Sequence, residues 1–309
     1  SGSQNGWRYN FQVARKLGDS YSAINNPKSA SYNPDKDGYA VTSSSGHLSY
    51  SPSRDHEIGA NYLVSDGWNR YDGFPGTKDH KQTETLYGVN LYTRNTLSAG
   101  WTSTLKIGKS SDRSRQYADG QPGSRIQSTQ TQYQWQNDVR LPLGQALFAL
   151  ERVEQTVGGS PNYTVRDRDI NSYLVGWTGK IGQHRLQANI RHDDNSQFGG
   201  HTTGSAAYGY QITPDWRANI SYGTGFKAPT FNDLYWPGSG NPNLKPEKSK
   251  NREASIHYET EQHHASLTYY RNDISDLIEW APAGGVWIPG NVAEAQLSGW
   301  TLAYAGDWA

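Results

Sequence analysis

The sequence alternates between apolar and polar residues with a period of two along almost its whole length, and this pattern constrains the fold most strongly. In the segment WRANISY every second residue is apolar: Trp216, Ala218, Ile220 and Tyr222. Successive side chains of a strand point to opposite faces, so each such segment has one apolar and one polar face. We count about fourteen segments of this kind and find no convincing amphipathic helix.

The connections between these segments alternate in length. Tight polar turns occur near 51–55, 97–99, 143–144, 181–182, 213–215 and 259–261. Longer connections rich in Gly, Asn, Asp and Ser lie between them, at about 18–38, 71–80, 113–125, 160–166 and 227–250. Short turns at one end and long loops at the other are typical of outer-membrane β-barrels, whose longer loops are extracellular.

The composition supports a barrel wide enough to hold water or another part of the protein. Only 34% of the 309 residues are hydrophobic, yet the chain has 21 Tyr and 11 Trp against 6 Phe. A barrel with a polar lumen needs only one apolar face, and its aromatic residues form girdles at the two membrane interfaces. A soluble β-propeller would instead show a repeat of ~40–50 residues, which we do not find. The sequence therefore predicts an all-β, transmembrane antiparallel β-barrel.

Several functional classes are disfavoured by charge and by short motifs. The 29 basic and 29 acidic residues balance, so we expect no nucleic-acid partner, and without cysteine there is no thiolate chemistry. The string Gly108-Lys109-Ser110 lacks the glycine that a phosphate-binding loop requires five positions earlier. The adjacent residues His192 and Asp193 point to opposite faces of a strand. We therefore expect no enzymatic activity.

The acidic loops are a better candidate for a site. The string NPDKDG at 33–38 resembles the opening of a calcium loop, but position twelve is Ser44 rather than a bidentate Glu, so it is not an EF-hand. Asp19, Asp72 and Asp79 lie in long connections that emerge on the same rim. These carboxylates either converge on a calcium ion or are unrelated solvated loop residues, and their spacing alone leaves both possibilities open.

The most specific stretch is YGTGFKAPTFNDLYWPGSGNPNLKPEKSKNREAS, at 222–255. This stretch resembles the barrel signature of TonB-dependent outer-membrane transporters. The resemblance implies a barrel of the 22-stranded type that holds a plug domain. About fourteen strands are present here, so we expect residues 1–309 to be a partial barrel domain that contains neither the plug nor the last strands.

Within that family the chain is most similar to the receptors for cobalamin (vitamin B12). The strings RHDDNSQFG at 191–199 and YRNDISDLI at 270–278 carry this similarity. The resemblance implies calcium bound by aspartates on the first long barrel loops, with Tyr71 as an aromatic contact to the corrinoid. The aspartates at the matching positions are Asp19, Asp35, Asp37, Asp72 and Asp79.

The resemblance thus implies an outer-membrane receptor of a Gram-negative bacterium that takes up cobalamin. Calcium-ordered extracellular loops would bind the ligand, and TonB would energise uptake through the missing plug. We expect a monomer whose partners are outer-membrane lipid and cobalamin. The segment at 110–125 differs from the family's ligand-contacting loop, which leaves a related corrinoid or another chelate open. The alternatives are a siderophore or haem receptor of the same family, or a soluble glycan-binding β protein.

Overall fold

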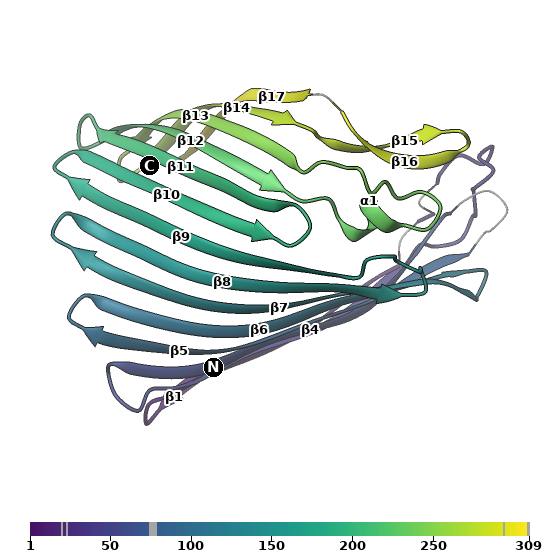
Figure 1. Cartoon of the computed structure of the whole chain (residues 1–309), viewed down its shortest axis with the longest axis horizontal. Helices are drawn as coiled ribbons and strands as arrows, with labels where there is room; N and C mark the ends of the chain where they lie inside the picture. Colours follow the sequence, from purple (N-terminus) through teal and green to yellow (C-terminus); the bar gives the residue numbers. More distant parts are fainter. Residues whose placement is uncertain (20, 23, 74–78, 293, 308–309) are drawn as a thin grey trace. The chain divides into compact units, whose positions relative to one another are not determined.

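The chain is an all-β protein in the computed structural model, which describes residues 1–309 except 20, 23, 74–78, 293 and 308–309. The described residues form seventeen strands and one short helix (Figure 1). In chain order these are β1 (Gly2–Gln4), β2 (Trp7–Gly18), β3 (Tyr39–Tyr50), β4 (His56–Tyr71), β5 (His80–Ser98), β6 (Trp101–Ala118), β7 (Gln121–Leu141), β8 (Gly144–Gly159), β9 (Asp167–Ile181), β10 (His184–Asn195), β11 (Gly199–Gln211), β12 (Trp216–Lys227), α1 (Phe231–Tyr235), β13 (Glu247–Glu259), β14 (His263–Ser275), β15 (Ile278–Ala283), β16 (Val286–Asn291) and β17 (Glu294–Gly306).

Fifteen of the strands form one sheet whose order follows the sequence. The order departs from the sequence once, where β14 pairs with β17 because β15 and β16 form a separate two-stranded hairpin. The strands β1 and β17 are the two ends of this order. No helix in the described part of the chain is long and apolar enough to cross a membrane.

The chain divides into two compact units. The first unit contains Ser1–Leu97, Thr104–Gln134 and Arg152–Asp169, and it carries the acidic loops after β2 and β4. The second unit contains Ser98–Ser103, Trp135–Glu151 and Ile170–Ala309, and it carries β10 to β17 together with α1.

The predicted alternation of apolar and polar faces is present in the strands. In β12 and β13, Trp216 lies opposite Tyr258 with ring centroids 4.9 Å apart, and Ala218 lies opposite Ile256 on the same face. This apolar face is open rather than packed, as the 58% exposure of Ile220 on β12 illustrates. A face that is apolar yet uncovered is the surface that a transmembrane barrel presents to lipid.

The most deeply buried apolar side chains of the second unit lie outside the large sheet. Leu234 of α1 is 2% exposed, and Pro229, Leu244 and Pro289 are also buried. These residues belong to the connection between β12 and β13 and to the β15–β16 hairpin, which lie together beyond the strand ends (Figure 1). The connection therefore has a small hydrophobic core of its own.

One predicted loop is wrong. The segment 113–125 was expected to be a long connection, but β6 extends to Ala118 and β7 begins at Gln121. The two intervening residues, Asp119 and Gly120, have φ angles of 50° and 76°. Positive φ at both central residues defines a tight hairpin turn, for which Asp-Gly is a preferred sequence. The polar residues of this segment therefore lie on strands.

The sheet contains fourteen strands of twelve or more residues, which agrees with the number of about fourteen expected from the sequence. It also contains the three-residue strand β1. The residue pattern did not predict α1 or the β15–β16 hairpin. Both are short elements within a loop region, where hydrophobic periodicity is too brief to be detected.

Candidate functional site

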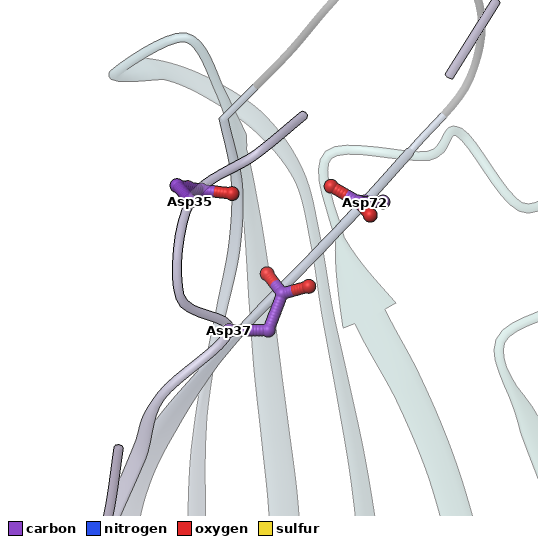
Figure 2. A group of neighbouring side chains, drawn as sticks. All are labelled: Asp35, Asp37 and Asp72. Atoms are coloured by element: carbon purple, nitrogen blue, oxygen red, sulfur yellow. The ribbon is translucent and has the colours of Figure 1, made fainter. Parts of the chain in front are cut away.

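Three of the predicted aspartates come together at the loop end of the first unit. Asp35 and Asp37 lie in the connection between β2 and β3, and Asp72 directly follows β4. Each offers a carboxylate oxygen, and the three oxygens lie within 4.8 Å of one another. Figure 2 shows the three side chains turned toward a shared space, and all three are partly buried.

Backbone hydrogen bonds hold the acidic turn against β4. The amide of Gly38 donates to the carbonyl of Lys36 at 3.0 Å, which closes the turn that carries Asp37. The carbonyl of Gly38 then accepts a hydrogen bond of 3.0 Å from the amide of Arg70. Because Arg70 lies only two residues before Asp72, this contact brings the two loops together.

Asp72 also fixes the first part of the β2–β3 connection. Its Oδ2 atom accepts hydrogen bonds from the Ser22 hydroxyl at 2.8 Å and from the Ile24 amide at 2.7 Å. These contacts leave the other oxygen, Oδ1, directed elsewhere. One carboxylate thus orders the neighbouring loop and still offers an oxygen to the cluster.

The cluster and its neighbour Asp79 contain buried oxygens that lack hydrogen-bond partners. These are Oδ1 of Asp35, Oδ1 of Asp72 and Oδ1 of Asp79. Leaving a buried charged acceptor unsatisfied is costly, and a divalent cation would satisfy such oxygens at once. Calcium binds oxygens at about 2.3–2.6 Å, so two of its ligands lie up to about 5 Å apart. The donor set and its spacing therefore fit calcium.

The other predicted site residues lie near this cluster but outside it. Asp19 is exposed, and its side chain lies beside Gly38 at the end of the acidic turn. A methyl group added at Gly38 would lie 3.6 Å from Oδ1 of Asp19. Asp79 faces Arg70 at 4.0 Å, and its amide donates to the Asp119 carboxylate at 2.9 Å. Tyr71, the predicted corrinoid contact, is half-buried, and its ring lies 5.3 Å from that of His80.

The electrostatics of the cluster reflect its crowding. Burial raises the pKa of Asp35 above its usual value, and the nearby charges of Asp37, Asp72 and Asp79 raise it further, while a backbone hydrogen bond opposes the shift. A raised pKa means that the ionised form of Asp35 destabilises the metal-free loop at neutral pH. Protonation or a bound cation would relieve this repulsion.

A calcium ion held by this cluster would be released on acidification at a higher pH than one held by aspartates with ordinary pKa values. Calcium needs ionised Asp35, so the apparent affinity should be constant above its raised pKa and fall about tenfold per pH unit below it. Calorimetric titration of calcium between neutral and mildly acidic pH measures this. In the Asp35→Asn variant the decrease of calcium affinity should occur at lower pH. An unchanged dependence of calcium affinity on pH would contradict the role of Asp35 as a calcium ligand.

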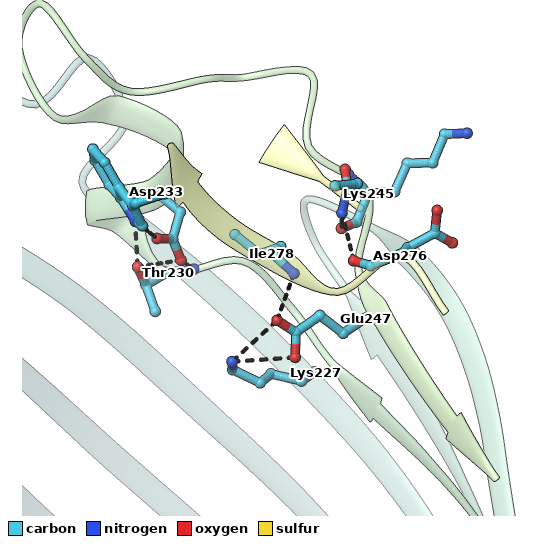
Figure 3. A network of polar contacts seen from close by, with 9 residues as sticks. Lys227, Thr230, Asp233, Lys245, Glu247, Asp276 and Ile278 are labelled. Atoms are coloured by element: carbon cyan, nitrogen blue, oxygen red, sulfur yellow. Dashed lines mark hydrogen bonds and ion pairs between the residues drawn. The ribbon is translucent and has the colours of Figure 1, made fainter. Parts of the chain in front are cut away.

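The second unit carries a loop platform, which we define as residues 228–246 with the β15–β16 hairpin. The Glu247 carboxylate, 11% exposed, accepts from Lys227 Nζ at 3.2 Å and from the Ile278 amide at 3.0 Å (Figure 3). The Trp280 indole donates to Asp233 at 2.9 Å. The platform is thus bonded both to the strands and within itself.

The platform depends on a helix that could not exist alone. The helix α1 has five residues, and helices of that length are unstable in water. A capping box holds it: the Asp233 amide donates to the Thr230 hydroxyl at 3.1 Å, and the Thr230 amide donates to the Asp233 carboxylate at 2.9 Å. The sequence carries this signal as Thr-x-x-Asp.

Sequence reasoning missed several residues that shape these loops. Ser22 gives no sequence signal, because its role depends on Asp72, which is 50 residues away. The pairing of Glu247 with Ile278 is equally non-local, at 31 residues. By contrast, the capping box of α1 was visible in the sequence and could have been found.

The fold agrees with the comparisons to known proteins. The family model described as "TonB dependent receptor-like, beta-barrel" matches residues 2–309. The chain belongs to this family. Membership confirms the prediction of a transmembrane β-barrel of the outer membrane of a Gram-negative bacterium.

Curated relatives include vitamin B12 transporters. The chain is 35% identical over 244 residues to "Vitamin B12 transporter BtuB" of Photobacterium profundum, a match that covers 76% of this chain and 40% of the relative. It is 41% identical over 151 residues to the protein of the same name from Vibrio vulnificus, covering 48% and 25%. The matches thus span less than half of these relatives' length.

Solved structures share the fold at low sequence identity. The siderophore receptor PirA from Acinetobacter baumannii has a TM-score of 0.78 at 16% identity, covering 98% of this chain and 56% of that chain. The Serratia marcescens hemophore receptor HasR has a TM-score of 0.74 at 14% identity, covering 98% and 58%. These likenesses establish the barrel architecture and do not distinguish between ligands.

Proposed function

We propose that the chain is part of the barrel of a cobalamin receptor, with loops that calcium orders before the corrinoid binds. The observation that carries the proposal is the cluster of Asp35, Asp37 and Asp72, with its unsatisfied buried oxygens. The identity to vitamin B12 transporters supports cobalamin, or a related corrinoid, as the ligand.

The proposed action of calcium is to order two loops. Ionised Asp35, Asp37 and Asp72 repel one another across a space of less than 5 Å, so the metal-free loops resist the arrangement that brings these carboxylates together. A bound calcium ion would supply the countercharge. Asp19 and Asp79 would add oxygens after small movements, since calcium prefers six to eight ligands. The neighbouring Tyr71 would then offer its ring to the corrinoid.

We extend the proposal to the whole receptor. Residues 1–309 form a partial barrel domain, and the intact protein would hold a plug through which TonB energises inward transport. No covalent step is needed, because the ligand is bound and moved without being changed.

Calorimetric titration of cyanocobalamin into the detergent-refolded chain, with and without millimolar calcium, tests the proposal. We expect binding that depends on calcium. Should no heat appear, the titration is repeated with the plug domain supplied in trans. Binding of haem or a ferric siderophore, but not cyanocobalamin, to the plug-supplemented chain would refute the cobalamin assignment and favour the alternative ligand class.

A further inference from the structure

We propose that a groove on the apolar face of β11 to β14 and β17 binds the phosphate-bearing headgroup of an outer-leaflet lipid. The groove has a volume of about 730 Å³ and lies entirely within the second unit. Its lining includes four basic and two acidic side chains: Lys248, Lys250, Arg252, Arg271, Asp273 and Glu294. We call Lys248, Lys250, Arg252 and Arg271 the basic cluster.

The strand register places the basic cluster on the lipid-facing side of the sheet. Arg252 lies directly opposite Tyr222 of β12, and directly opposed residues share a face. The Arg252 guanidinium also lies over the Tyr222 ring, 5.9 Å from its centroid. Lys250 and Lys248 follow at intervals of two along β13, and Arg271 lies opposite Arg252 on β14. All four therefore extend the face that carries the apolar belt.

The cluster lies at the loop end of that face, just beyond an aromatic girdle. Tyr269 of β14 and Trp300 of β17 pack with ring centroids 4.9 Å apart, and Arg271 comes two residues after Tyr269. Lys248 directly follows Glu247, which anchors the loop platform. Because the long loops of such barrels are extracellular, this position corresponds to the headgroups of the outer leaflet.

The local acidic groups do not balance the cluster. Asp273 is shared between two guanidinium groups, at 2.5 Å from Arg252 and 2.9 Å from Arg271. Glu294 is the other carboxylate of the lining, which leaves two more basic than acidic groups. Lys248 and Lys250 are exposed on a face that meets lipid.

Phosphate is the chemistry that best complements this arrangement. Unbalanced cations are costly at the lipid-facing surface of a barrel, except where headgroups supply the countercharge. Guanidinium groups recognise phosphate through paired hydrogen bonds, and lysine binds it as a point charge. A lipid phosphate in the groove would place its acyl chains along the apolar belt that begins at Tyr222 and Tyr269. A soluble phosphate would gain nothing from this belt.

The test measures binding of diphosphorylated lipid A to the full chain in neutral detergent. The Lys248→Gln/Lys250→Gln variant should weaken binding by about tenfold or more, because each basic residue near an anionic lipid surface contributes roughly fivefold. The control Lys106→Gln/Lys180→Gln makes the same change of charge at two lysines of β6 and β9 that lie outside the groove. The control should change affinity by less than about twofold, and Lys248→Arg/Lys250→Arg should preserve binding.

Two further ligands separate the sources of phosphate. Dephosphorylated lipid A should bind at least as weakly as the double glutamine variant binds the intact lipid, because Arg252 and Arg271 then also lose their phosphate contacts, and inorganic pyrophosphate should compete poorly. Equal binding of the dephosphorylated lipid, or wild-type affinity in the glutamine variant, would overturn the proposal. If pyrophosphate displaced lipid A at a concentration equal to that of the lipid, the groove would be a site for a soluble anion. This result would also overturn the proposal.

Discussion

The Asp35→Ala/Asp37→Ala variant is expected to lose calcium-dependent corrinoid binding while keeping its strands intact. The two side chains supply two of the three clustered carboxylates, and both lie in a loop. Calcium affinity depends strongly on the number of charged ligands, so we expect a decrease of about 100-fold or more. Calorimetric titration of calcium, followed by cyanocobalamin, measures both effects.

The matched control for this variant is Asp55→Ala/Asp215→Ala. These two aspartates lie in the short turns before β4 and β12, and neither belongs to the carboxylate cluster. Their loss changes the net charge equally, so a nonspecific electrostatic effect would appear in both variants. If the control lost as much calcium affinity as the Asp35 and Asp37 variant, the cluster would not be the calcium site.

The Leu234→Ala variant is expected to unfold the loop platform locally without disturbing the large sheet. Leu234 is 2% exposed and belongs to a helix of five residues that depends on packing. Truncating a buried leucine costs about 2–5 kcal/mol, which is enough to raise amide exchange in the platform by about 30-fold or more. Hydrogen exchange of residues 231–246, compared with that of β12 and β13, measures the effect.

Leu302→Ala is the control for the platform variant. Leu302 is 77% exposed on the apolar face of β17, so its truncation leaves no cavity inside the platform. Amide hydrogen exchange in the platform should stay at the wild-type rate in the Leu302→Ala variant. If amide hydrogens of the platform exchanged as slowly in the Leu234→Ala variant as in the wild type, buried apolar contacts would not be what holds α1.

The sheet was predictable because its signal is repeated and local. The alternation Trp216, Ala218, Ile220 and Tyr222 depends only on the two-residue period of a strand and on the need for one apolar face. Fourteen long strands carry variants of this pattern, so an error in one segment does not change the fold. The misread turn at Asp119 and Gly120 illustrates the point, because polar strand residues near a tight turn resemble a loop.

The site was predictable only in part, since its geometry depends on contacts between distant residues. The DKDG string and the family resemblance identified Asp35, Asp37 and Asp72 as candidates. Spacing could not show that these three approach one another while Asp19 and Asp79 lie outside the cluster, because that arrangement depends on the Arg70–Gly38 backbone contact. The platform was missed for the same reason, since Glu247 and Ile278 meet only in the folded chain.

The shared carboxylate of Asp72 makes the two acidic loops a single thermodynamic unit. It accepts hydrogen bonds from Ser22 and Ile24 in one loop while its own backbone belongs to the other. Fixing either loop therefore lowers the entropy that must be lost to fix its neighbour, and the linkage is reciprocal. An insertion in the loop after β4 would consequently loosen the loop after β2, so the lengths of the two loops are expected to vary together rather than independently.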